Sequence, residues 1–380
     1  MALHFMKTTR TKHPYLCWED LQTTPSMVKD IVQEKKEIED VTEKLSRKRF
    51  DSLWLTGVGS SFNQLLTGLC IFRDIVKLPV TLIHSFDLVH YSLPPGLDEN
   101  SVLIDVSQTG RTKAAVEAAE LAKKRSVRVV AVTTVPDSPL AKAADYLIYI
   151  QAAAEDFPVI PFKQYIGALT IIYLFAIAMA RRLRVRDTSR ISALEFQLKG
   201  IPSILSRVLR NEQHLVDLAG KYENKDIFYF VGQGPNFGTA HESAVKIREC
   251  VRKKSVGIST EEIAHGAFNA LDEESVVVVI APPGGSYDRA LALVKAIDVM
   301  GATTISVVDQ SDSKVAEASD EVIKMPGKLP EILTPITYIA PLQLLIYHMA
   351  VEKGLNPDLI GTDEARSRKA WDILFPVGTH

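Results

Sequence analysis

The sequence predicts an α/β protein of two tandem domains, each a parallel, doubly wound sheet enclosed by helices as an αβα sandwich. Three observations predict this fold. The chain of 380 residues is long enough for two domains. One sequence pattern occurs twice at a constant spacing, the spacing that separates Gly57 from Gly232. Within each copy, short runs rich in β-branched residues alternate with helical stretches, which is typical of βα units in a parallel sheet.

The repeat covers five segments without a gap. The pairs of matching segments are 54–61 with 229–236, 102–106 with 277–281, 129–133 with 304–308, 138–148 with 313–323, and the apolar helices that follow Gly167 and Leu342. One spacing kept across five segments is hard to obtain by chance. We therefore interpret the chain as two copies of one domain.

The predicted strands of the first copy are apolar over their whole length rather than alternating with polar residues. They cover Leu53–Thr56, Val102–Val106, Val127–Val132 and Tyr146–Ile150, and the stretch Lys113–Lys124 between two of them has a helical pattern. Continuous apolar runs indicate strands that are covered on both faces. In such sheets ligands bind where loops leave the carboxyl ends of the strands.

These patterns divide the chain into four parts. We predict an N-terminal arm and helix over residues 1–50, a first domain over 51–195, a second over 196–360 and a tail over 361–380. Thr24-Pro25 is expected to cap and open a helix that runs to about Leu45, and Arg181–Pro202 is expected to join the copies as a helix. The tail is expected to be irregular.

Composition and charge exclude several classes of protein. The net charge of −2 does not fit a general binder of nucleic acid or of anionic membranes. The three cysteines lie far apart, which argues against a zinc module or a disulfide framework. The most apolar stretch, 168–180, is shorter than the roughly 20 residues of a membrane span. We expect a cytoplasmic protein with no metal or organic cofactor and no nucleic-acid or membrane partner.

Two hydroxyl-rich turns of the first copy suggest an anion site. Ser107-Gln-Thr-Gly-Arg-Thr112 follows a strand and opens a helix, and Gly57-Val-Gly-Ser-Ser61 does the same one unit earlier. Hydroxyls, an amide and the free N–H groups of a helix N-terminus suit a phosphate. The alternative is ordinary N-capping by Ser and Thr. In the second copy Pro282-Pro283 replaces Ser107-Gln108.

A second set of candidate residues lies in the other copy. Glu242, Lys246 and Glu249 share one face of a predicted helix, and His265 follows behind the acidic pair Glu261-Glu262. The alternative is a surface Glu–Lys ladder with an incidental histidine. Neither Gly-rich turn has the full dinucleotide-binding pattern, which argues against a dehydrogenase.

These motifs together resemble the sugar isomerase (SIS) domain family. The closest resemblance is to the isomerase half of the glucosamine-6-phosphate synthases and to their deaminase and deglycase relatives. It implies that Gly59, Ser60 and Ser61 of one turn and Ser107, Gln108, Thr109 and Thr112 of the other hold the phosphate of a hexose.

The resemblance also implies roles for the second set. Glu249 would move a proton between C1 and C2 of the sugar, and Lys246 would neutralise charge near O1 and O5. Glu242 would orient the lysine, and His265 would assist ring opening, in relatives from a neighbouring subunit. A proton shuttle between adjacent carbons needs one carboxylate beside both, and the negative charge that develops on oxygen needs a cation.

The sequence departs from the family pattern at two places, and these departures narrow the range of reactions that we expect. Met1 is followed by Ala2 rather than a nucleophilic cysteine, so glutaminase activity is not expected. Arg366, or the stretch 367–371, stands where the family has a sugar-contacting lysine, and this tail looks closer to the deglycases. We expect a glucosamine-6-phosphate isomerase or deaminase that acts as a homodimer or larger assembly with shared sites. The alternatives are a fructosamine-6-phosphate deglycase, a simple isomerase of a phosphorylated or sulfonated hexose, and a non-catalytic sensor.

Overall fold

Two parallel five-stranded sheets with the same strand order form the framework. The computed structural model describes residues 10–91, 95–151 and 160–375. The first sheet has the order β2-β1-β3-β4-β5 and the second the matching order β7-β6-β8-β9-β10. All their pairings are parallel. The strands are β1 Ser52–Gly57, β2 Val80–His84, β3 Ser101–Val106, β4 Arg128–Thr133, β5 Tyr146–Tyr149, β6 Ile227–Val231, β7 Lys254–Ile258, β8 Ser275–Ala281, β9 Thr303–Asp309 and β10 Glu321–Met325. The predicted fold class is confirmed.

Helices cover both faces of each sheet, which explains the continuous apolar runs. In the first domain, the domain of β1–β5, Leu53 and Ile104 face one helical layer, whereas Trp54 and Leu103 face the other. The helices of this domain are α3 Ser60–Ile71, α4 Ser85–His90, α5 Lys113–Lys124, α6 Pro139–Ala143 and α7 Phe162–Arg182, with a π-helical turn η1 at Phe72–Val76. Those of the second domain are α11 Phe237–Val251, α12 Thr260–Ala264, α13 Tyr287–Val299, α14 Lys314–Glu317 and α15 Pro335–Glu352, with short turns η2 Gly234–Asn236, η3 Ala267–Ala270, η4 Glu331–Leu333 and η5 Pro357–Leu359.

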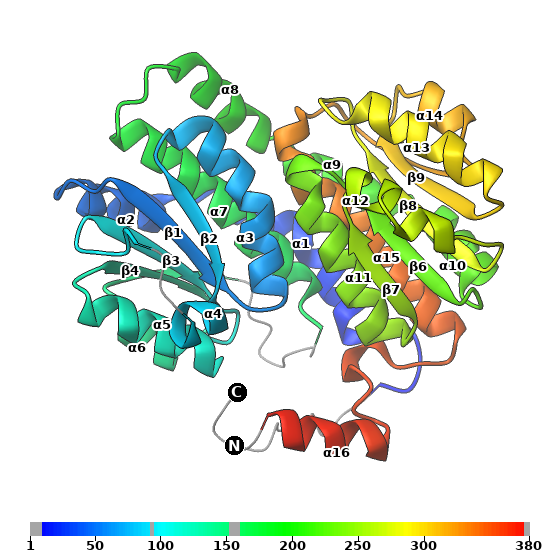
Figure 1. The fold of residues 1–380 in the computed structure, drawn as a ribbon, viewed down its shortest axis with the longest axis horizontal. Coiled ribbons are helices and arrows are strands. Elements are labelled where there is room, and N and C mark those ends of the chain that lie inside the picture. The colour runs from blue at the N-terminus through cyan, green and yellow to red at the C-terminus, as the bar shows by residue number, and fades with distance from the viewer. Residues whose placement is uncertain (1–9, 92–94, 152–159, 376–380) are drawn as a thin grey trace.

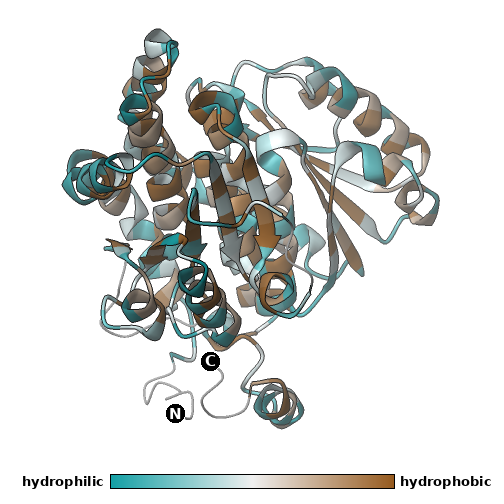
Figure 2. Ribbon diagram, turned by 60° about the vertical axis from the view of Figure 1, so that its left-hand side comes forward, coloured by the Kyte–Doolittle hydropathy of each residue, from teal (hydrophilic) through white to brown (hydrophobic). Residues whose placement is uncertain are grey.

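The two sheets share one central layer of helices. Helices α1, α3 and α7 meet α11 and α15 between the sheets, and their apolar residues belong to a single core. Figure 2 shows hydrophobic residues gathered in the strands and in these central helices. Helix α7 is long and apolar enough to cross a bilayer, but 89% of its most apolar window is buried inside the protein. The second domain thus packs against the first through helices that each domain contributes.

The N-terminal helices differ from the prediction. Helix α1 covers Leu16–Gln33 with Pro25 inside it, and α2 covers Lys36–Ser46. The expected start at Thr24 is wrong because the amide N–H groups of Leu16 and Cys17 donate to the Asp358 carboxylate, both at 2.9 Å. This carboxylate caps the helix from near the other end of the sequence. Packing of α1 against α7 holds the helix together past its proline.

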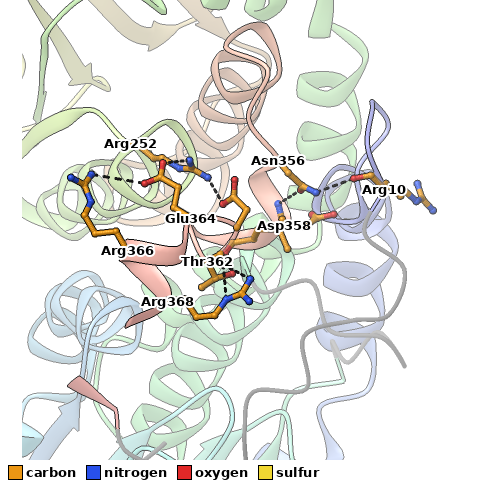
Figure 3. Close-up of polar contacts among 10 residues, drawn as sticks. Arg10, Arg252, Asn356, Asp358, Thr362, Glu364, Arg366 and Arg368 are labelled. Atoms are coloured by element: carbon orange, nitrogen blue, oxygen red, sulfur yellow. Dashed lines mark hydrogen bonds and ion pairs between the residues drawn. The ribbon is translucent and has the colours of Figure 1, made fainter. Parts of the chain in front are cut away.

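The tail is more helical than expected, and the single helix expected over Arg181–Pro202 is interrupted at 183–187 and at 199–200. Three helices, α8 Thr188–Leu198, α9 Ile201–Arg210 and α10 Glu212–Tyr222, lead into the second domain. Residues Ala365–Leu374 form α16, so the expectation of an irregular tail is wrong there. Helix α16 buries none of its residues and stands apart from the sheets (Figure 1). Two acidic residues just before α16 bind Arg252 at the end of α11 (Figure 3). Arg252 donates to Asp363 and, from Nη1, to Glu364 Oε1 at 2.6 Å, and these contacts attach the start of α16 to the second domain.

Candidate functional site

The predicted residues of the two domains meet where α3 crosses α11. The ammonium group of Lys246 donates to Ser60 Oγ at 3.1 Å and to Glu249 Oε2 at 2.7 Å. It also lies 3.3 Å from Glu242 Oε1. Gly238 allows this close crossing, because a Cβ there would collide with the Thr67 side chain of α3. One lysine of the second domain therefore contacts both its own carboxylates and the first turn of the first domain.

Burial separates the roles of the two carboxylates. Glu242 is fully buried, and its Oε2 accepts a hydrogen bond from Asn63 Nδ2 of α3 at 2.9 Å. Glu249 keeps 29% of its side chain exposed. Burial alone would lower the pKa of Lys246, but the adjacent Glu242 and Glu249 outweigh it and raise this pKa. The arrangement therefore holds a permanent cation beside one fixed anion and one carboxylate that solvent or a ligand can reach.

The second hydroxyl-rich turn is held open by its backbone. The carbonyl of Gln108 accepts hydrogen bonds from Thr134 N at 2.9 Å and from the side chains of Thr133 and Thr134. Gly110 adopts φ +60°, and a Cβ there would collide with Ser138. Hydrogen bonds from residues at the end of β4 thus hold the loop in place.

The hydroxyls of these turns do not serve as helix caps. Thr112 is the N-cap residue of α5 but makes no side-chain capping bond, and its Oγ1 accepts instead from Ser107 Oγ at 3.3 Å. Gly59, the N-cap residue of α3, has no side chain to cap with. Thr109 Oγ1 accepts from Arg111 N at 3.3 Å within the same loop. Ordinary N-capping therefore does not explain the hydroxyls at these positions.

A small cavity joins the two turns. Ser60 and Ser61 of the first turn and Gln108 of the second line it, together with residues from α3, from α7 and from the ends of β3 and β5: Gln64, Val106, Ile150, Pro161, Gln164, Tyr165 and Ala168. Ser107, Thr109 and Thr112 lie outside this lining. Because Ser60 also contacts Lys246, the cavity and the Glu242–Lys246–Glu249 cluster are adjacent.

The equivalent loop of the second domain contains an anion supplied by the chain itself. Glu331 Oε2 accepts from Gly285 N at 2.9 Å, and Oε1 accepts from Ser286 Oγ at 3.2 Å. The carboxylate lies so close to Gly284 that a Cβ there would collide with it. This loop is therefore closed to an external anion, in agreement with the loss of hydroxyls at Pro282-Pro283.

Two predicted residues lie away from the cluster in the single chain. His265 is exposed at the end of α12 and, in the part of the chain that the structure describes, shares no hydrogen bond or ion pair with Lys246 or Glu249. Arg366 keeps 94% of its side chain exposed and lies 3.9 Å from Glu364, its ion-pair partner (Figure 3).

Sequence reasoning missed three polar residues at or near the site. Asn63 holds Glu242, Gln64 lines the cavity, and Glu331 fills the second loop. The first two were visible as a polar pair inside an otherwise apolar helix, Phe62-Asn-Gln-Leu-Leu66. No group of three or more potential metal ligands occurs among residues 10–91, 95–151 and 160–375.

Curated relatives are similar to the chain over most of its length. It is 33% identical over 335 residues to the glutamine–fructose-6-phosphate aminotransferase (isomerizing) of Pyrococcus horikoshii. The matched stretch covers 88% of this chain and 54% of that protein. The enzyme of the same name from Thermococcus kodakarensis is 30% identical over 347 residues, covering 91% of this chain and 56% of that protein. The chain thus spans about half the length of these curated relatives.

The fold matches solved structures of similar proteins. The C-terminal domain of glucosamine-fructose-6-phosphate aminotransferase from Francisella tularensis superposes with a TM-score of 0.80 at 20% identity, over 88% of this chain and 96% of that one. Glucosamine-6-phosphate deaminase from Thermotoga maritima gives 0.63 at 24% identity, over 89% and 97%. The SIS domain model matches residues 52–178 and again 221–353. With both domains matched and their strand order repeated, the chain belongs to the SIS domain family.

Proposed function

We propose that the protein is a sugar-phosphate isomerase that moves a proton between C1 and C2 of an anionic hexose. The preferred substrate is an amino sugar of the glucosamine 6-phosphate type. The contact of Lys246 with both Ser60 and Glu249 carries the proposal, because it joins the predicted phosphate turn to the predicted base. The names of the curated relatives, which contain fructose 6-phosphate, support a phosphorylated hexose, and the name of the Thermotoga maritima relative, glucosamine-6-phosphate deaminase, supports an amino sugar.

The proposed reaction uses only side chains of this family site. The phosphate binds at the two turns, with Ser60, Ser61 and Gln108 at the cavity and with Ser107, Thr109 and Thr112 from the second turn. Glu249 takes the proton from one carbon, the C–H electron pair forms the C=C bond of an enediol or enamine, and the carbonyl or imine atom gains a proton. Glu249 then returns its proton to the neighbouring carbon, using the electron pair of the C=C bond, and the hydroxyl or amino group on the first carbon loses its proton as the new C=O or C=N bond forms. No electron leaves the sugar, so the reaction needs no oxidant or reductant.

The cation has a specific part in this scheme. Negative charge develops on the sugar oxygen as the proton leaves, and a buried ammonium group stabilises it far more than solvent would. Lys246 keeps its proton because its pKa is raised by Glu242 and Glu249. Asn63 holds Glu242, and Glu242 in turn holds the lysine beside the base.

His265 and the assembly complete the proposal. An exposed histidine at the end of α12 suits ring opening only if it reaches the site of a second copy of the chain. We therefore propose a homodimer or larger cytoplasmic assembly in which each site takes His265 from a neighbour.

Deuterium exchange tests the proposed reaction. The protein is incubated in deuterated water with glucosamine 6-phosphate, fructose 6-phosphate or a fructosamine 6-phosphate adduct, and NMR follows deuterium at C1 and C2. Glu249→Gln is expected to abolish exchange and to leave sugar-phosphate binding measurable by calorimetry. Glu117→Gln, which alters a surface Glu–Lys pair with a 3.7 Å contact to Lys113, is the matched control and should exchange normally.

The products separate the alternatives. Release of ammonia indicates a deaminase, release of an amine or amino acid indicates a deglycase, and exchange without loss of nitrogen indicates a simple isomerase. A protein that binds these sugars but exchanges no deuterium with any of them would instead be a sensor, and the proposal would be wrong.

A further inference from the structure

The cavity between the two turns contains a hydrogen-bond acceptor that no described residue satisfies. Gln64 lies on α3, one helical turn after Ser60, and only 5% of it is exposed. Its Oε1 is buried and has no hydrogen-bond partner within residues 10–91, 95–151 and 160–375. Buried amide oxygens in proteins are nearly always hydrogen-bonded, so an unpartnered one beside a cavity indicates a donor that enters the cavity.

The orientation of this amide is fixed. Gln64 Nε2 donates to the carbonyl oxygen of Tyr165 at 3.3 Å. Turning the amide around would place two oxygen atoms against each other, so the NH₂ group must face Tyr165. Oε1 is therefore the atom left for a ligand.

Gln164, on another part of the cavity wall, is held by the N-terminal helix. Gln164 lines the cavity from α7, and its Nε2 donates to Asp20 Oδ2 of α1 at 3.1 Å. Asp20 and Gln164 are both buried. The N-terminal helix, which lies outside the repeat, thus supports one wall of the cavity.

All three glutamines of this lining, Gln64, Gln108 and Gln164, belong to the domain with the hydroxyl turns. At the repeat spacing, Thr239 stands in the place of Gln64 and Ile339 in the place of Gln164. Gln64 and Gln164 therefore occur only in the copy that has the predicted anion site and are not a feature of the repeated fold.

We propose that Gln64 is a specificity-determining residue, whose Oε1 accepts a hydrogen bond from a hydroxyl or amine N–H of the substrate close to its anionic end. This inference rests on the proposed function. The phosphate group of a sugar phosphate has lost both protons above pH ~7 and then offers only acceptors, so it cannot satisfy Oε1 itself. The donor must come from the sugar, and Gln64 thereby distinguishes a sugar phosphate from an anion without a donor, such as sulfate, and from a deoxygenated analogue.

Calorimetry with two probes, sulfate and fructose 6-phosphate, tests the inference. Gln64→Met keeps the length of the side chain but removes the acceptor. It should weaken binding of fructose 6-phosphate about tenfold and change the affinity for sulfate, which has no donor, less than twofold. Gln343→Met is the matched control, because buried Gln343 donates Nε2 to the Phe162 carbonyl at 3.2 Å and its Oε1 has no partner in the described chain, but it lies outside the cavity lining. It should bind both probes as the wild type does.

A second variant keeps the inference testable if Gln64→Met does not fold. Gln64→Glu places a carboxylate in the cavity and should weaken the binding of sulfate more than tenfold. The inference is overturned if Gln64→Met binds fructose 6-phosphate normally, if it loses both probes equally, or if Gln64→Glu binds sulfate normally. Wild-type protein that binds neither probe would refute the proposed function as well, whereas normal wild-type binding with an unaffected Gln64→Met refutes only the role of Gln64.

Discussion

Replacing Lys246 by methionine tests the electrostatic core of the site. The lysine is 1% exposed and Glu242 is 0% exposed, so removal of the ammonium leaves a buried carboxylate that is held by Asn63. Breaking a buried ion pair from one side costs about 3–5 kcal/mol. Glu249 also loses its partner, but its side chain is 29% exposed and solvent can reach it, so only the pair with Glu242 is counted in this figure. We expect Lys246→Met to lower the free energy of unfolding by about 3–5 kcal/mol.

Urea unfolding of single and double variants measures this cost. Lys246→Met combined with Glu242→Gln removes both buried charges and should recover at least half of the lost stability. Lys123→Met is the control, because Lys123 forms an ion pair with Asp145 at 2.8 Å but is 42% exposed. Its replacement should cost less than about 1 kcal/mol. A cost below about 1 kcal/mol for Lys246→Met, or no recovery in the double variant, would refute the reasoning.

Three further predictions concern a buried acid and the two loops. Asp105 is fully buried, neither of its oxygens is hydrogen-bonded within the described chain, and burial raises its pKa well above the usual range. The folded protein therefore binds a proton that the unfolded chain releases above pH ~4, and stability falls as the pH rises. The gain in unfolding free energy from Asp105→Asn should accordingly be larger at pH 8 than at pH 5, and equal gains would contradict this. Gly110→Ala places a side chain at φ +60° and against Ser138, so it should lower the free energy of unfolding by about 1–2 kcal/mol. It should also weaken phosphate binding in calorimetry, and unchanged affinity would contradict the role of this loop as an anion site. Glu331→Ala frees Gly285 N–H, and phosphate should then raise the melting temperature more than in the wild type, whereas equal shifts would show that the carboxylate does not replace an anion.

The sequence was sufficient for the parts of the fold that depend on local pattern. Strands apolar on both faces, a repeat with constant spacing and loops with hydroxyls at strand ends are all visible in the order of residues. The same holds for Glu242, Lys246 and Glu249, because helical spacing places them on one face, and the structure brings them together with Ser60.

The features that could not be predicted depend on contacts between distant segments. The start of α1 is set by Asp358, and the N–H groups that it caps carry no sign of this in their own neighbourhood. The burial of Asn63 and Gln64 could not be predicted from their helix alone, because it depends on contacts with α11 and α7. The helix at Ala365–Leu374 buries nothing, so it leaves no apolar stripe from which to predict it.

The carboxylate of Glu331 has a consequence for how the two halves diverged. A loop that folds around a negative charge must obtain it from a metabolite or from its own polypeptide. Because Glu331 supplies that charge, this loop of the second domain needs no bound anion to keep its conformation. Across homologues, an acidic residue at this position and a Ser-Gln pair at Pro282-Pro283 should therefore exclude each other.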